Sequence, residues 1–111
     1  MDSDRLIHPG EILKEEFLEP HGINPNQLAM RLGAPPNAIT AIVNGTRGIS
    51  GPMSVLLGHA FGLSDGSFAH LQTRYELVRA AIEAGRNGRA AERLRRADVL
   101  AKELLGSSGA S

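Results

Sequence analysis

Cysteine and tryptophan are absent from this chain of 111 residues, which has one tyrosine and three phenylalanines. The absence of cysteine excludes a disulfide framework, a cysteine-based zinc site and a thiol nucleophile. No apolar run approaches the ~20 residues that span a bilayer, and the first residues lack the basic and apolar regions of a signal peptide. We therefore expect a cytoplasmic protein that does not associate with a membrane.

Charge is balanced over the whole chain but not along it. Hydrophobic residues make up 41% and charged residues 22%, as is usual for a globular protein. Residues 1–84 carry six basic and nine acidic side chains, a net charge of −3, whereas residues 85–111 carry six basic and three acidic, a net charge of +3. The stretch from Asn24 to Gly48 contains Arg31 and Arg47 and no acid. Local charge, rather than the total, therefore bears on possible partners.

Proline, glycine and apolar spacing predict an all-α protein. Helix starts are indicated by Pro9, by Asn24-Pro25-Asn26-Gln27 with its capping-box pattern, and by Ser50 and Ser64. The expected segments are 9–20, 25–33, 36–44, 50–62, 64–82 and 89–105. We expect a domain over residues 1–84, an arginine-rich C-terminal helix over 85–105 and a flexible tail over 106–111.

The second and third segments form a candidate helix-turn-helix. Gly33 provides the turn, and Ala29 has the small side chain that a closely crossing helix requires. The third segment turns Asn37, Ala41 and Asn44 away from the core, with Ala38 and Thr40 on the flanks, and Gln27 and Arg47 are placed to meet phosphates. Short polar side chains on an exposed helix suit the DNA major groove. The alternative is an ordinary helical hairpin with a solvated polar face.

Longer motifs resemble the HigA family of antitoxins, which have an Xre-type helix-turn-helix. The resemblance covers about residues 6–80 and is carried by His8-Pro9-Gly10-Glu11-Ile12-Leu13-Lys14-Glu15-Glu16-Phe17-Leu18, Gln27-Leu28-Ala29, Leu32-Gly33, Pro35-Pro36-Asn37-Ala38-Ile39, Ile42-Val43-Asn44-Gly45-Thr46-Arg47-Gly48-Ile49 and Leu71-Gln72-Thr73-Arg74-Tyr75-Glu76-Leu77. The combination of the first and fifth of these segments is far more specific than a helix-turn-helix alone.

The resemblance implies a five-helix, lambda-repressor-like DNA-binding domain, here with an additional C-terminal helix. It implies a homodimer that binds double-stranded DNA at a palindromic operator, represses its own operon and neutralises a RelE-like toxin. It also adds Pro36 and Thr46 to the DNA-binding set of Gln27, Asn37, Ala38, Thr40, Ala41, Asn44 and Arg47. This chain departs from similar proteins at Ala38, which is commonly Arg, and at Thr46, which is often Lys.

Two further stretches suggest contacts outside the helix-turn-helix. An apolar stripe with spacings of 3 and 4 predicts a two-fold dimer interface, formed by Phe68, Leu71, Tyr75, Val78 and Ile82. Arg86, Arg89, Arg93 and Arg96 fall on one predicted helical face. This basic face is either solvated and paired with the protein's own acids, or in contact with phosphates, or in contact with a toxin. The helix itself is expected to pack through its leucines.

The sequence offers no support for catalysis. The four histidines, at positions 8, 21, 59 and 70, have no metal-ligand spacing, and no serine lies in a GxSxG context. We expect no enzymatic activity, no metal and no cofactor. Two alternatives to an antitoxin repressor remain: a solitary Xre-type regulator without a toxin, and a protein-interaction module that has lost affinity for DNA.

Overall fold

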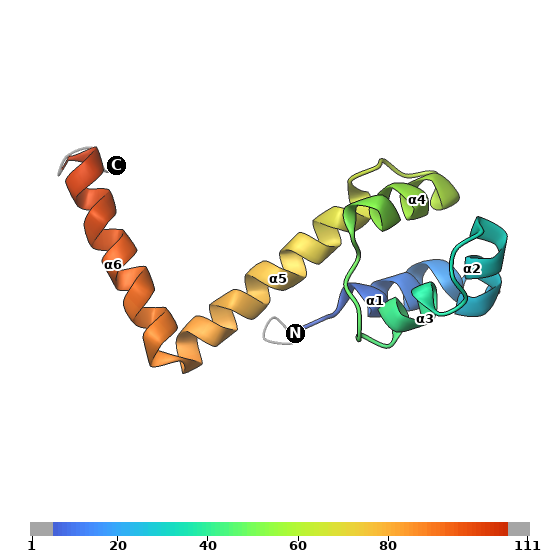
Figure 1. Ribbon diagram of the computed structural model, residues 1–111, viewed down its shortest axis with the longest axis horizontal. Coiled ribbons are helices and arrows are strands. Elements are labelled where there is room, and N and C mark those ends of the chain that lie inside the picture. The colour runs from blue at the N-terminus through green and yellow to red at the C-terminus, as the bar shows by residue number, and fades with distance from the viewer. Residues whose placement is uncertain (1–5, 107–111) are drawn as a thin grey trace. The chain divides into compact units, whose positions relative to one another are not determined.

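A computed structural model describes residues 6–106, and its regular elements are all helices (Figure 1). They are α1 (Pro9–Ile12), the π-helical η1 (Leu13–Leu18), α2 (Pro25–Leu32), α3 (Ala38–Val43), α4 (Gly51–Phe61), α5 (Ser67–Arg86) and α6 (Gly88–Leu105). The predicted all-α class is confirmed. Within residues 6–106 no helix is both long and apolar enough to cross a membrane.

The chain divides into two compact units, Met1–Glu76 and Leu77–Ser111. The boundary falls inside α5, which continues as one helix as far as Arg86, and so lies before the break expected after residue 84. The predicted tail lies outside the described residues from position 107 onward.

The first predicted segment contains a change of helical type. After four α-helical residues the chain widens into η1, and the N–H of Glu19 donates to the carbonyl of Lys14 at 2.9 Å. Leu13 and Leu18, five residues apart, are both buried. A π-helical turn brings residues at this spacing nearer to the same face than an α-helical turn does, so both leucines can enter the core.

The ends of α2 and α4 follow the predicted chemistry. The N–H of Gln27 donates to Oδ1 of Asn24 at 2.8 Å, and the N–H of Asn24 donates to Oε1 of Gln27 at 2.9 Å, which completes the capping box. At the other end Gly33 takes a φ of 71°, in the left-handed region that glycine adopts without strain. For α4, Ser50 caps the start and Gly62 the end.

Two helices begin later than predicted. The third begins at Ala38 rather than Pro36, because Pro35 and Pro36 lie in a turn and the N–H of Ala38 donates to the carbonyl of Pro35 at 3.0 Å. The fifth begins at Ser67 rather than after Ser64. Its start is held by buried Ser54 of α4, whose Oγ accepts from the N–H of Ala69 at 2.7 Å and donates to the carbonyl of Asp65 at 2.6 Å.

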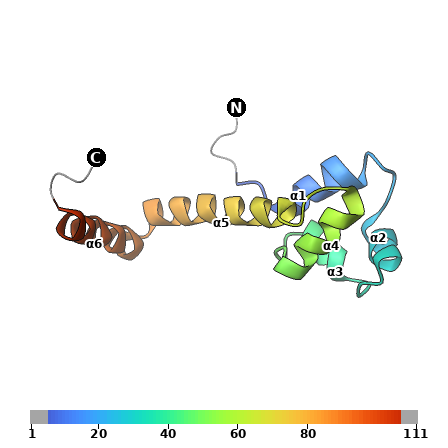
Figure 2. The ribbon, with the colours of Figure 1, turned by 90° about the horizontal axis from the view of Figure 1, so that it is seen from above.

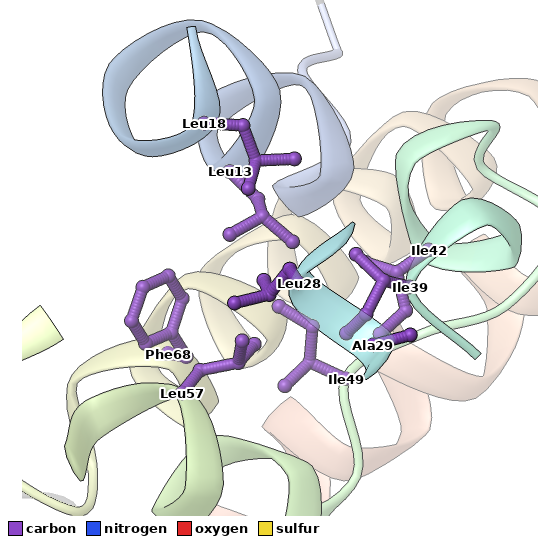
Figure 3. Packing of buried hydrophobic residues seen from close by; sticks show 9 residues of the cluster. All are labelled: Leu13, Leu18, Leu28, Ala29, Ile39, Ile42, Ile49, Leu57 and Phe68. Carbon is purple, nitrogen blue, oxygen red and sulfur yellow. The ribbon is translucent and has the colours of Figure 1, made fainter. Parts of the chain in front are cut away.

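The core of the first unit is assembled from η1, α2, α3, α4, the start of α5 and the segment between α3 and α4. Figure 3 shows its buried side chains converging from η1, α2, α3, α4 and the start of α5. They are Leu13, Leu18, Leu28, Ala29, Ile39, Ile42, Ile49, Leu57 and Phe68. Ala29 is fully buried beside Ile39 and Ile42, as expected for a small residue under a crossing helix (Figure 3). α2 and α3 therefore pack directly on each other (Figure 2).

Gly10 allows α1 to lie unusually close to α3. A Cβ atom at this position would lie 1.8 Å from the carbonyl oxygen of Ile42 and 3.0 Å from the Cα of Val43. Both neighbours are backbone atoms, so they cannot rotate away as a side chain could. Glycine is therefore required here by close packing of two backbones, and not by its φ angle.

We predict that Gly10→Ala lowers the free energy of unfolding by about 3 kcal/mol, because α1 must separate from α3 to admit the methyl group. Urea denaturation followed by circular dichroism measures the change. Gly51→Ala, at the exposed start of α4 with no atom within 4 Å of the added Cβ, is the matched control and should leave stability within about 0.5 kcal/mol. Equal stability of the two variants would contradict the role of Gly10.

Candidate nucleic-acid interface

The outward face of α3 carries the side chains predicted to read DNA, and most of them are available. Asn37 and Asn44 flank the helix, are exposed, and make no side-chain hydrogen bond within residues 6–106. Asn37 occupies the N-cap position without using its carboxamide as a cap. Pro36 is exposed beside it, and Ala41 is half-buried. Both donor and acceptor atoms of the two asparagines are therefore free for another molecule.

Ala38 is placed differently from the prediction. It is 2% exposed, because it lies on the same face of α3 as Ile42, four residues later, which is fully buried. The assignment of the Ala38 side chain to the flank of the DNA-facing surface is therefore wrong.

Thr40 and Thr46 use their hydroxyl groups inside the protein. Oγ1 of Thr40 donates to Oδ1 of Asn26 on α2 at 3.3 Å, and Oγ1 of Thr46 donates to the carbonyl of Ala41 at 3.1 Å. The first bond links the two helices of the helix-turn-helix. The second closes the C-terminal end of α3, where the backbone N–H groups of Thr46 and Arg47 meet the same carbonyl. Thr40 therefore ties α3 to α2 and Thr46 closes the end of α3, roles that their sequence spacing did not indicate.

Gln27 and Arg47 lie at the edges of the helix-turn-helix. Oε1 of Gln27 is engaged in the capping box, which leaves its Nε2 amino group free to donate from the start of α2. Arg47 is exposed just after α3, and within residues 6–106 its guanidinium has no acidic partner. The sequence from residue 20 to residue 64 contains no Asp or Glu at all, so no carboxylate of α2, α3 or α4 would repel a phosphate.

Gln72 of α5 is a positioning residue that the sequence reasoning missed. Its Oε1 accepts from the N–H of Ile49 at 2.8 Å, while its Nε2 donates to Oε2 of Glu76 at 2.8 Å. Gly48 lies so close that a Cβ there would be 2.9 Å from the Gln72 amide. The segment that follows Arg47 is therefore anchored to α5. Only the position of Gln72 in the family-like motif could have indicated this contact.

His8 joins three elements around the C-terminal end of α3. Its Nδ1 accepts from the N–H of Gly10 at 2.9 Å and so caps α1. Its ring packs edge-on against Tyr75 of α5, with ring centroids 4.8 Å apart, and lies beside Gly45. Burial lowers the pKa of His8 below its usual value, against a smaller opposing effect of Glu11. The neutral ring, with its proton on Nε2, is thus the form that the fold stabilises.

The stripe predicted as a dimer interface divides into two parts. Phe68 is fully buried and packs against Phe17, with ring centroids 5.1 Å apart, and against Phe61 at 6.2 Å. Its assignment to the interface is therefore wrong, because the start of α5 belongs to the core. Leu71 also packs on the core, whereas Tyr75, Val78 and Ile82 are half-buried. The stripe after Phe68, Leu71 included, is half-buried and can still face a second molecule.

The arginine face is also shorter than predicted. Asn87 is extended and caps α6, which places Arg86 on α5 and leaves Arg89, Arg93 and Arg96 on α6. Glu92 pairs with Arg95 at 2.7 Å and with Arg96 at 3.7 Å. The leucines of α6 are exposed and none of its residues is buried, so the expected packing of this helix through its leucines is not present in the single chain.

Comparison with known proteins finds similar chains among DNA-binding antitoxins. No family model matches this chain. The Pseudomonas aeruginosa antitoxin HigA, solved with the higBA promoter, is 39% identical, with 80% of this chain and 94% of that chain covered and a TM-score of 0.70. A second P. aeruginosa protein, solved with its 18-bp operator DNA, is 42% identical, with 68% and 82% covered and a TM-score of 0.67. Antitoxin HigA-1 of Vibrio cholerae is 33% identical over 66% of this chain and 69% of its own length.

We predict that the stability of the protein falls as pH drops below about 6.5, because His8 is held neutral in the folded state and is protonated more easily when unfolded. Above that pH the contribution of neutral His8 to the free energy of unfolding is fully present. Protonation of Nδ1 removes the cap of α1, a loss of about 1 kcal/mol. Urea unfolding at pH 5 to 8 measures the trend. His8→Asn, which retains a capping acceptor that does not titrate, should show a weaker dependence, and identical pH profiles would contradict the prediction.

Proposed function

This chain belongs to the HigA family of helix-turn-helix antitoxins, and from that membership we infer that it is a sequence-specific DNA-binding repressor and the antitoxin of a toxin–antitoxin pair. The observation that carries the inference is the free, acid-free outer face of α3, held in place by α1, α2 and α5. Its action is binding rather than catalysis.

α3 would enter the major groove and read base edges with short polar side chains. The carboxamide of Asn37 can bond in a bidentate manner to adenine, and Asn44 offers a second amide one helix length away. Gln27 and Arg47 would contact the phosphates on either side of the groove. Thr40 and Thr46 would act indirectly, through the bonds that hold α3 and its C-terminal end. Ala38 is buried and would make no contact with DNA.

We predict that Asn37→Ala and Arg47→Ala weaken DNA binding in different ways. Asn37→Ala should reduce affinity for the operator by about 1–3 kcal/mol and relax sequence preference, because it removes a base contact. Arg47→Ala should weaken binding to operator and random DNA alike and reduce the salt dependence, because it removes a phosphate contact. Gel-shift titrations of the promoter region upstream of the chain's own gene, at several salt concentrations, measure both effects.

Arg74→Ala is the matched control for loss of one positive charge. Arg74 is exposed on α5, outside the helix-turn-helix. Arg74→Ala should leave the sequence preference of DNA binding unchanged. Wild-type binding by both Asn37→Ala and Arg47→Ala would show that α3 is not the recognition helix, whereas failure of the unmodified protein to bind the promoter region would favour the protein-interaction module over the repressor.

We also propose that the repressor is a two-fold homodimer on a palindromic operator. The later part of the α5 stripe supplies half-buried Tyr75, Val78 and Ile82 at spacings of 3 and 4, which is the pattern of a helix seam. Two copies related by a two-fold axis would present two α3 helices about 34 Å apart, one turn of DNA.

We expect Ile82→Glu to raise the dimer dissociation constant by at least about tenfold, because it places a charge in the apolar seam of α5. Sedimentation equilibrium measures the constant. Ala81→Glu, on the adjacent exposed position, carries the same charge and should leave it unchanged. A wild-type protein that is monomeric at tens of micromolar, alone and on operator DNA, would contradict the dimer.

A RelE-like toxin is the partner that family membership favours, and cytoplasmic location follows from a role at an operon. A short basic protein encoded next to this chain's gene should form a stable complex with it. If no such neighbour exists, the solitary Xre-type regulator is the better description, with the DNA predictions unchanged.

A further inference from the structure

α6 carries an unpaired apolar seam. Its positions repeat at spacings of 4, 3, 4 and 3, which is the heptad pattern of a coiled coil: Ala90, Leu94, Ala97, Ala101 and Leu104. Leu94 is 55% exposed and Leu104 is 73% exposed, and none of the helix's residues is buried. An 18-residue helix of this composition is only marginally stable in water by itself. The seam therefore needs a partner from outside the described chain.

The residues that flank the seam identify the partner. In the heptad that places Leu94 at position a and Ala97 at position d, Arg93 falls at g and Asp98 at e. The next g and e positions are Leu100 and Leu105. In a parallel pair of identical helices, each g residue meets the e residue five positions later on the other helix. Arg93 would then meet Asp98 of the second copy, and Leu100 would meet Leu105.

We propose that α6 pairs in parallel and in register with α6 of a second copy of this chain. The parallel arrangement gives two Arg–Asp pairs across the seam and two Leu–Leu pairs on the other heptad step. An antiparallel arrangement pairs e with e and g with g, so it would bring Asp98 toward Asp98 of the other copy in one register, or Arg93 toward Leu100 in another, and neither register forms an Arg–Asp pair. The charges thus select both the partner and the direction.

The remaining arginines of α6 are compatible with this pairing. Arg89, Arg95 and Arg96 fall at outer heptad positions, and the last two already pair with Glu92 on the same outer side. They would remain in solvent when the seam closes. Alanine at three of the five seam positions makes the pairing weak on its own, so it acts together with the separate α5 contact, which raises the local concentration of the two α6 helices.

The absence of cysteine allows a direct test by cross-linking in the full chain. Ala101→Cys places one thiol at an a position, where parallel, in-register helices bring equivalent residues together. We expect a covalent dimer on mild oxidation at micromolar protein. Val99→Cys, on the outer side, is the matched control and should remain monomeric under denaturing conditions. Failure of Ala101→Cys to cross-link beyond Val99→Cys would overturn the proposal.

Charge reversal tests the selection of partner and direction. Arg93→Asp and Asp98→Arg should each raise the dimer dissociation constant about tenfold, because each places like charges across the seam. The double variant restores the opposite pair and should return the constant close to that of the wild type. α6 buries no residue, so the fold of the first unit should not change in any variant.

Two results of the charge test would overturn self-pairing. One is an unchanged dissociation constant in both single variants. The other is a loss of DNA or toxin binding in both single variants with the dimer intact, which would assign α6 to that partner instead. Ile82→Glu tests the α5 contact separately, and gel shifts test the helix-turn-helix, so failure of this proposal leaves the proposed function standing.

Discussion

The position of α3 depends on one close approach between backbones. α1 lies so near the carbonyl of Ile42 that no side chain larger than hydrogen fits at Gly10. His8 caps the start of α1, next to Gly10, and its ring lies between Gly45 and Tyr75. The N-terminal motif is therefore a structural support for α3.

Several polar side chains around α3 are already occupied by the protein itself. Thr40 bonds to α2, Thr46 closes the end of α3, and Gln72 holds the segment after Arg47. Such bonds restrict the helix to one orientation, which a specific base contact needs because its hydrogen bonds tolerate little displacement. Within residues 6–106, Asn37, Asn44 and Arg47 are exposed and their side chains have no internal partner. On the proposed function these are the side chains that would meet DNA.

α5 and α6 show how one apolar pattern can have different roles along its length. The start of the α5 stripe is core, with Phe68 completely buried against aromatic rings, whereas Val78 and Ile82 extend past the first unit. The apolar residues of α6 have the same spacing, but none of them is buried within residues 6–106. Stability of the first unit comes from its own core, whereas the leucines of α6 are exposed and contribute little burial within the single chain.

The sequence by itself determined the helices and most of their ends, because caps act between residues two to five apart and leave a readable pattern. Asn24 with Gln27, Ser50, Gly33 and Gly62 are examples. It also determined the outward direction of Asn37 and Asn44. Only the tertiary structure decided the burial of Ala38 and Phe68, the contact of Gly10 with Ile42, and the bonds from Ser54 to Ala69 and from Gln72 to Ile49. These contacts join residues far apart in the chain, where no periodicity relates one partner to the other and packing alone brings them together.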